Sequence, residues 1–78
     1  FPRMGEAAYR RRRLLARLVR IRERRDLKQK DVAERMGTSQ AEVSRIESGE
    51  VDLRSSTLER YALAVGQDIR YQLSPVRG

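Results

Sequence analysis

The chain has 78 residues, with 18 Lys and Arg against 11 Asp and Glu, so its formal net charge at pH 7 is +7. It contains no cysteine and no histidine, which excludes disulfide scaffolds, thiolate or imidazole metal sites, and Cys or His nucleophiles. No apolar run approaches the ~20 residues of a membrane span. We expect one small soluble intracellular domain with a polyanionic partner and no cofactor.

Residues 6–25 have the composition and the periodicity of a first helix, because Ala, Leu, Arg and Glu dominate and Gly and Pro are absent. The predicted apolar stripe of this helix comprises Leu14, Leu15, Leu18, Val19 and Ile21. The run Arg10–Arg13 stands beside it. A charge run on a helix is usually a solvated face, and contact with DNA phosphates or attraction to RNA or a membrane are the alternatives. The membrane alternative fails because the core needs the leucine stripe.

Two short helices with a tight turn between them come next. Residues 29–36 are predicted as the second helix, and Gly37 stands where a left-handed residue ends a helix. Ser39 and Glu42 have the spacing of a capping box, so a third helix begins there and continues to about Ser48. The inward positions of this helical pair are predicted to be Val32, Ala33, Met36, Val43 and Ile46.

A fourth helix opens at a second capping-box spacing, Ser56 to Glu59, with either Ser55 or Ser56 as its N-cap, and it ends at Gly66. Its predicted buried stripe consists of Leu58, Tyr61, Ala62 and Val65.

The period then changes from helical to two, because Ile69, Tyr71 and Leu73 alternate with polar residues up to Pro75. This alternation predicts a strand over residues 67–74. A lone strand needs a partner for its amide and carbonyl groups. Antiparallel pairing with a second copy across a two-fold axis supplies one, and a tail lying on the chain's own helices is the alternative.

Residues 21–49 resemble the Cro/C1-type (XRE) helix-turn-helix family in the series Leu-x-Gln…Ala…Gly…Ser…Val-Ser-Arg-Ile-Glu-x-Gly. The similarity runs from about Leu14 to Gly66. The ending Ser-Thr-Leu-Glu-Arg-Tyr-Ala-Leu-Ala-Val-Gly, followed by a strand, is similar to HigA-like antitoxins.

The expected architecture is therefore all-α: a compact four-helix, lambda-repressor-like helix-turn-helix domain over residues 6–66, followed by a dimerising strand over 67–74 and a tail over 75–78. Residues 1–5 are expected to be disordered or foreign to the natural chain.

The resemblance implies that the start of the third helix enters the major groove of double-stranded DNA. Four side chains would face base edges there: Gln40, Ala41, Ser44 and Arg45. The chemistry fits, since Gln pairs with adenine, Arg with guanine, and a methyl group contacts thymine. The predicted contacts to phosphates are Lys28, Gln29, Lys30, Ser39, Ser48 and Arg54.

The resemblance also pairs Arg22 with Glu47 in an internal salt bridge, which is expected to be structural. Lys28 departs from the family, which commonly has Ser or Thr as the N-cap of the second helix. An ammonium group cannot accept a hydrogen bond, so this helix loses a cap, and Asp31 near the positive end of the helix partly offsets the loss. Glu42 is predicted to be a capping-box partner, and contact with a cytosine amino group is the alternative.

These observations predict a homodimeric, sequence-specific transcriptional regulator, an autorepressor on a palindromic operator, in the cytoplasm and associated with the nucleoid. The similarity to HigA-like proteins adds a second role as the antitoxin of a type II toxin–antitoxin pair, with a toxin bound through the first helix or the strand. A prophage or restriction-modification type repressor without a toxin partner is the alternative. An enzyme is excluded by the lack of a nucleophile with its base, a phosphate-binding loop or a carboxylate pair.

Overall fold

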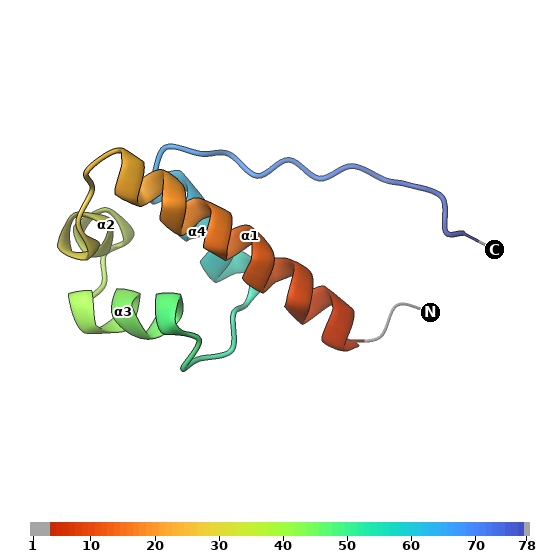
Figure 1. Cartoon of the computed structure of the whole chain (residues 1–78), viewed down its shortest axis with the longest axis horizontal. Helices are drawn as coiled ribbons and strands as arrows, with labels where there is room; N and C mark the ends of the chain where they lie inside the picture. Colours follow the sequence, from red (N-terminus) through yellow and green to blue (C-terminus); the bar gives the residue numbers. More distant parts are fainter. Residues whose placement is uncertain (1–3, 78) are drawn as a thin grey trace.

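The computed structural model describes residues 4–77, which form four helices (Figure 1). They are α1 (Met4–Arg24), α2 (Gln29–Met36), α3 (Gln40–Ser48) and α4 (Ser55–Ala64). α1 is the longest helix and α4 lies against it, while α2 and α3 follow each other across a short turn at one end of the molecule. Within residues 4–77 no helix is both long and apolar enough to span a membrane.

The core lies where the four helices meet. Its largest fully buried side chains are those of Tyr61, Val32, Val43 and Val65, and burying an apolar side chain of this size stabilises the fold by about 1.5–3 kcal/mol. The predicted inward positions of α2, α3 and α4 are all buried, which confirms these three stripes. Leu53, in the connection between α3 and α4, is also buried and was not predicted.

The buried side of α1 differs from its predicted stripe. Leu15 and Leu18 are the core residues, whereas the other three predicted members are only partly buried. Arg11 and Arg22 share the inward side with these leucines, because each guanidinium hydrogen-bonds to a group on another segment. α1 also begins two residues before its predicted start, so residues 4 and 5 of the predicted disordered N-terminus are helical. Residues 1–3 and residue 78 of the predicted tail lie outside the described residues.

The ends of α2 and α3 follow the predicted turn chemistry. Gly37 and Gly49 take left-handed conformations with φ angles of 70° and 87°, which glycine adopts without a Cβ penalty. Ser39 Oγ accepts a hydrogen bond of 3.1 Å from the Glu42 amide, which confirms Ser39 as the N-cap of α3. Asp31 lies in the first turn of α2, near its positive end as predicted, and its carboxylate also accepts a bond of 2.8 Å from the Lys28 amide.

Two predicted caps are wrong. The Glu42 carboxylate does not complete the capping box, because it binds Arg45 in place of the Ser39 amide. At the start of α4 neither candidate serine is the N-cap. Arg54 occupies that position, with no side-chain capping bond, and both serines lie inside the helix.

The C-terminal segment leaves α4 after Gly66 and continues without helix or strand to residue 77 (Figure 1). The predicted strand is therefore not formed in the single chain. Ile69 packs against the core and is partly buried, but Tyr71 is 71% exposed and Leu73 is fully exposed. A strand exists only as part of a hydrogen-bonded ladder, and residues 4–77 contain no second strand to complete one.

The turn between α2 and α3 gives a test of the backbone. Replacing Gly37 with Ala is expected to lower the free energy of unfolding by about 1–2 kcal/mol, since the left-handed conformation places a Cβ close to the next carbonyl oxygen. Gly5→Ala is the matched control, because Gly5 is exposed within α1 and a helical Ala is more stable than Gly by about 0.5–1 kcal/mol. Urea denaturation measures both, and equal effects of the two substitutions would refute the requirement for glycine in the turn.

Candidate nucleic-acid interface

The outward side of α3 carries the four predicted base-reading side chains. Gln40, Ala41, Ser44 and Arg45 are all exposed, whereas Val43 and Ile46 on the opposite side are buried. We call these four exposed residues the recognition face. The helix is amphipathic because its apolar positions are three residues apart. The same packing that anchors α3 therefore points the recognition face toward solvent.

Arg45 already has a partner within the recognition helix. Its Nη2 lies 2.9 Å and its Nε 3.3 Å from Oε2 of Glu42. Both side chains are well exposed, at 50% for Arg45 and 37% for Glu42. An exposed ion pair of this kind contributes only ~0–1 kcal/mol. The pair can therefore orient the guanidinium in the free protein and still be exchanged for a base edge or a phosphate.

The carboxylate of Glu47 on α3 accepts hydrogen bonds from three side chains, one from each of the other helices. Arg22 of α1 donates to it through Nε at 2.8 Å and through Nη2 at 3.0 Å. Gln29 Nε2 of α2 donates at 3.0 Å, and the Tyr61 hydroxyl of α4 donates at 2.6 Å. We call these four residues the Glu47 cluster. The structure thus brings the predicted pair of Arg22 and Glu47 together and adds two members.

Neither added member was assigned to this cluster from the sequence. Tyr61 was predicted only as a core residue, although a buried tyrosine hydroxyl needs a hydrogen-bond partner. A tyrosine at a predicted core position therefore could have indicated a buried polar partner near Tyr61. Gln29 was predicted to contact a phosphate, and the structure shows its side chain donating to Glu47. Its backbone amide lies in the first turn of α2, where amides lack partners within the helix.

The cluster shifts the proton equilibria of two of its members. Burial raises the pKa of Tyr61 well above the ordinary 10.0, and the hydrogen bond to the Glu47 carboxylate raises it further, against the smaller effect of Arg22. For Arg22, burial alone lowers the pKa, but the hydrogen bond and the charge of Glu47 outweigh burial, so the pKa is raised. The cluster is therefore most stable with both protons in place.

Five of the six predicted phosphate contacts are exposed. Lys28 and Lys30 lie at the start of α2, Ser39 and Ser48 lie at the two ends of α3, and Arg54 lies just before α4. The hydroxyl groups of both serines are already used in the free protein. Ser39 Oγ caps α3, and Ser48 Oγ donates to the Arg45 carbonyl at 3.1 Å.

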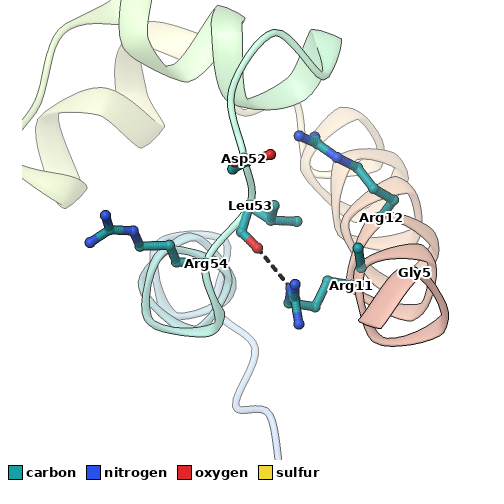
Figure 2. A pocket seen from close by; sticks show the side chains of 7 residues that line it. Gly5, Arg11, Arg12, Asp52, Leu53 and Arg54 are labelled. Carbon is teal, nitrogen blue, oxygen red and sulfur yellow. Dashed lines mark hydrogen bonds between the residues drawn. The ribbon is translucent and has the colours of Figure 1, made fainter. Parts of the chain in front are cut away.

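The four arginines of the run Arg10–Arg13, predicted as one solvated face, differ in their exposure. Arg10 and Arg13 are exposed, but Arg11 and Arg12 are partly buried and reach the segment between α3 and α4. Arg11 Nε donates to the Leu53 carbonyl at 2.7 Å, as Figure 2 shows. Arg12 donates to the Ile46 carbonyl at 3.0 Å and also to the carbonyl of Val51. Expecting one solvated face for the whole run was therefore wrong.

These two arginines line a hollow between α1 and residues 52–54 (Figure 2). Arg54 borders the same hollow and extends away from Arg11 and Arg12. The guanidinium groups of Arg11 and Arg12 are both bound to backbone carbonyls. On this side of the hollow they therefore have a structural role, which is to hold the connection between α3 and α4 against α1. Arg54 is thereby placed at the surface beside the N-terminus of α4.

A model of the helix-turn-helix family matches residues 18–72, which is more than two thirds of the chain. The chain belongs to the XRE-type helix-turn-helix family. This family consists of DNA-binding regulators, so the protein is a sequence-specific DNA-binding transcription regulator. The family is not a catalytic one, which agrees with the prediction that the chain is not an enzyme. No curated protein and no solved structure matches the chain.

The raised pKa of Tyr61 predicts a loss of stability in alkali. Below pH 10 the hydroxyl is protonated in the folded and in the unfolded chain, and its contribution is fully present. Above pH 10 the unfolded chain releases this proton first, so the free energy of unfolding falls by up to about 1.36 kcal/mol per pH unit.

Denaturation between pH 8 and about pH 11 measures this slope in the wild type, in Tyr61→Phe and in Tyr9→Phe. The Tyr61→Phe variant should lose much of the decline, and the substitution at the exposed Tyr9 should leave it unchanged. The same alkaline slope in all three proteins would contradict the assignment to Tyr61.

Proposed function

We propose that the protein represses its own promoter as a homodimer that reads a palindromic operator with the recognition face. The observation that carries this proposal is the exposure of all four recognition-face side chains on a helix whose other side is anchored by Val43, Ile46 and the Glu47 cluster. A rigidly held helix can present side chains to base edges in one register. The net charge of +7 supplies the attraction to phosphates that precedes reading.

Each recognition-face residue has a specific task in this proposal. Gln40 pairs with an adenine, Arg45 pairs with a guanine after releasing Glu42, and the methyl group of Ala41 contacts a thymine. Ser44 donates to or accepts from a neighbouring base edge. In the free protein the carboxylate of Glu42 lies beside the guanidinium and limits the directions in which Arg45 can point before it meets a base.

The phosphate contacts fix how deeply α3 enters the groove. We assign them to Lys28, Lys30 and the first amides of α2 on one side of α3, and to Arg54 on the other. Amides at a helix N-terminus are natural phosphate ligands. Gln29 contributes through its amide and, by donating to Glu47, ties this phosphate site to the position of α3. Ser39 and Ser48 lie at the two ends of α3 and add weaker hydroxyl contacts.

The C-terminal segment supports the dimer. Tyr71 and Leu73 are exposed and alternate with polar residues, and the segment has no ladder partner within residues 4–77. Antiparallel pairing of this segment with that of a second copy would satisfy its amides and cover both side chains. Two recognition helices about 34 Å apart would then face successive major grooves.

An antitoxin function is a second candidate. The same exposed segment favours it, because apolar side chains such as Leu73 and Val76 are available to a partner of another kind. Co-expression with the neighbouring genes and purification of the complex tests it. A small protein that co-purifies in defined stoichiometry would support the antitoxin, whereas none would favour a prophage or restriction-modification type repressor.

Base reading can be tested on a site selected from random duplexes. Arg45→Ala is expected to weaken binding to the selected site by about 1–3 kcal/mol and to remove discrimination at one base pair. Lys30→Ala should weaken binding to every sequence equally and reduce the slope of log K against log salt by about 0.9. Anisotropy titrations at several salt concentrations measure both effects. Unchanged discrimination by the Arg45→Ala variant would exclude Arg45 as a base-reading residue.

Dimerisation can be tested separately from base reading. The wild type should scatter light as a species of twice 9.1 kDa, and Leu73→Asp should shift it to the monomer and weaken binding to the palindrome. Val76→Asp is the matched control, because Val76 is similarly exposed but lies beyond the predicted strand. A dimer that persists in the Leu73→Asp variant, or a monomeric wild type even with DNA, would refute pairing through this segment.

A further inference from the structure

Five arginines form a straight row on the outer side of α1. They are Arg10, Arg13, Arg17, Arg20 and Arg24, which follow one another at alternating spacings of three and four residues, and all are exposed. At 1.5 Å per residue the row is about 21 Å long. We call it the arginine stripe. Neither DNA reading nor the cluster around Glu47 uses any of its members.

The arginine stripe points away from the recognition face. The inward side of α1 carries Arg12 and Arg22, which bind Ile46 and Glu47 of α3. The stripe lies on the other side of α1, and the recognition face lies on the side of α3 turned away from the core. A duplex held by the recognition face therefore leaves the stripe free.

The stripe destabilises the helix that carries it. Like charges three or four residues apart on a helix repel each other, and the stripe contains four such neighbouring pairs. The cations in ion pairs within residues 4–77 are Arg22, Arg45 and Arg70, so none belongs to the stripe. Arg13 lies 5.8 Å from the centre of the Tyr9 ring, which offers a small compensation. A row of like charge that forms no ion pair within residues 4–77, and has only this small compensation, indicates a binding surface.

We propose that the arginine stripe docks an acidic helix of a partner protein. Alternating spacings of three and four residues are those of the seam of a coiled coil, which keeps facing a second helix along its whole length. A partner helix with Glu or Asp at the same spacing would place a carboxylate opposite each guanidinium. All five members are arginine, whose planar fork binds carboxylates bidentately. The phosphate backbone of DNA winds around the duplex. A straight row of arginines would therefore follow the backbone over only part of the row's length.

The test uses the whole chain and two model peptides of equal composition. One is an alanine-based helix with Glu at the a and d positions of three heptads, and the other has the same Glu residues scrambled around the helix. Fluorescence anisotropy measures binding of each peptide, and of a random DNA duplex of equal length, to the protein pre-bound to its selected operator. The patterned peptide should bind at least about fivefold more tightly than the scrambled one, because only it can place a carboxylate opposite every guanidinium of the stripe.

Two double variants with equal loss of charge localise the binding. Arg13→Gln with Arg20→Gln should weaken the patterned peptide by about tenfold, because two ion pairs are lost. Arg70→Gln with Arg77→Gln changes exposed arginines outside the stripe and should change binding less than about twofold. The variant with Arg13→Gln and Arg20→Gln should keep the operator affinity of the wild type within about threefold at moderate salt. Arg13→Glu with Arg20→Glu leaves three arginines against two glutamates in the stripe and should abolish the preference for the patterned peptide over the scrambled one.

Equal binding of patterned and scrambled peptides would overturn the proposal, as would equal effects of the two double variants. A selective loss of operator affinity in the variant with Arg13→Gln and Arg20→Gln would assign the stripe to the operator interface instead. Tighter binding of the random duplex than of the patterned peptide would identify a second nucleic-acid surface and also overturn it. Operator binding is read out in every arm, so a failure of the DNA-binding proposal is distinguished from a failure of this one.

Discussion

The carboxylate of Glu47 is the point on which the arrangement of the four helices depends. It accepts hydrogen bonds from Arg22, Gln29 and Tyr61, which belong to the three other helices. Its side chain is only 9% exposed and that of Arg22 only 12%, so a loss of either partner would leave a nearly buried charge unpaired, at a cost of about 3–5 kcal/mol. Glu47 lies on the recognition helix itself. The bonds that hold the fold together therefore also set the direction of the recognition face.

Arginine side chains hold the ends of the short helices. Arg60 donates to the Met36 carbonyl at the end of α2, and Arg12 donates to the Ile46 carbonyl near the end of α3. Arg35 donates to the carbonyl of Ala64, the last residue of α4, and Arg25 donates to the carbonyl of Val65 directly after it. The final carbonyls of a helix lack internal partners and form its negative end, so a cation there is favourable. Helices of eight to ten residues are marginal alone. Part of the positive charge that suggests a DNA partner is thus structural.

The approximate extent of each helix could be predicted from local signals, whereas the partners of polar and charged side chains could not. Gly37 and Ser39 identify the turn because their conformational and capping preferences act over a few residues. The prediction for Glu42 was wrong because a nearby arginine competed with the backbone amide for its carboxylate. The expected solvated run on α1 was wrong at Arg11 and Arg12, because carbonyls more than thirty residues away in sequence bind them. The strand was not formed because pairing needs a second strand.

The sequence by itself determined the four helical segments, the turn at Gly37, the inward positions of α2, α3 and α4, and the membership of a DNA-binding family, since periodicity, capping and glycine conformation are local properties of the chain. Only the tertiary structure decided which polar side chains are structural. It placed Gln29 and Tyr61 at Glu47, divided the arginines of α1 between carbonyl contacts and an outer stripe, and left Leu73 exposed. Hydrogen-bond partners distant in sequence are chosen by packing, and packing is defined only when all four helices are in place.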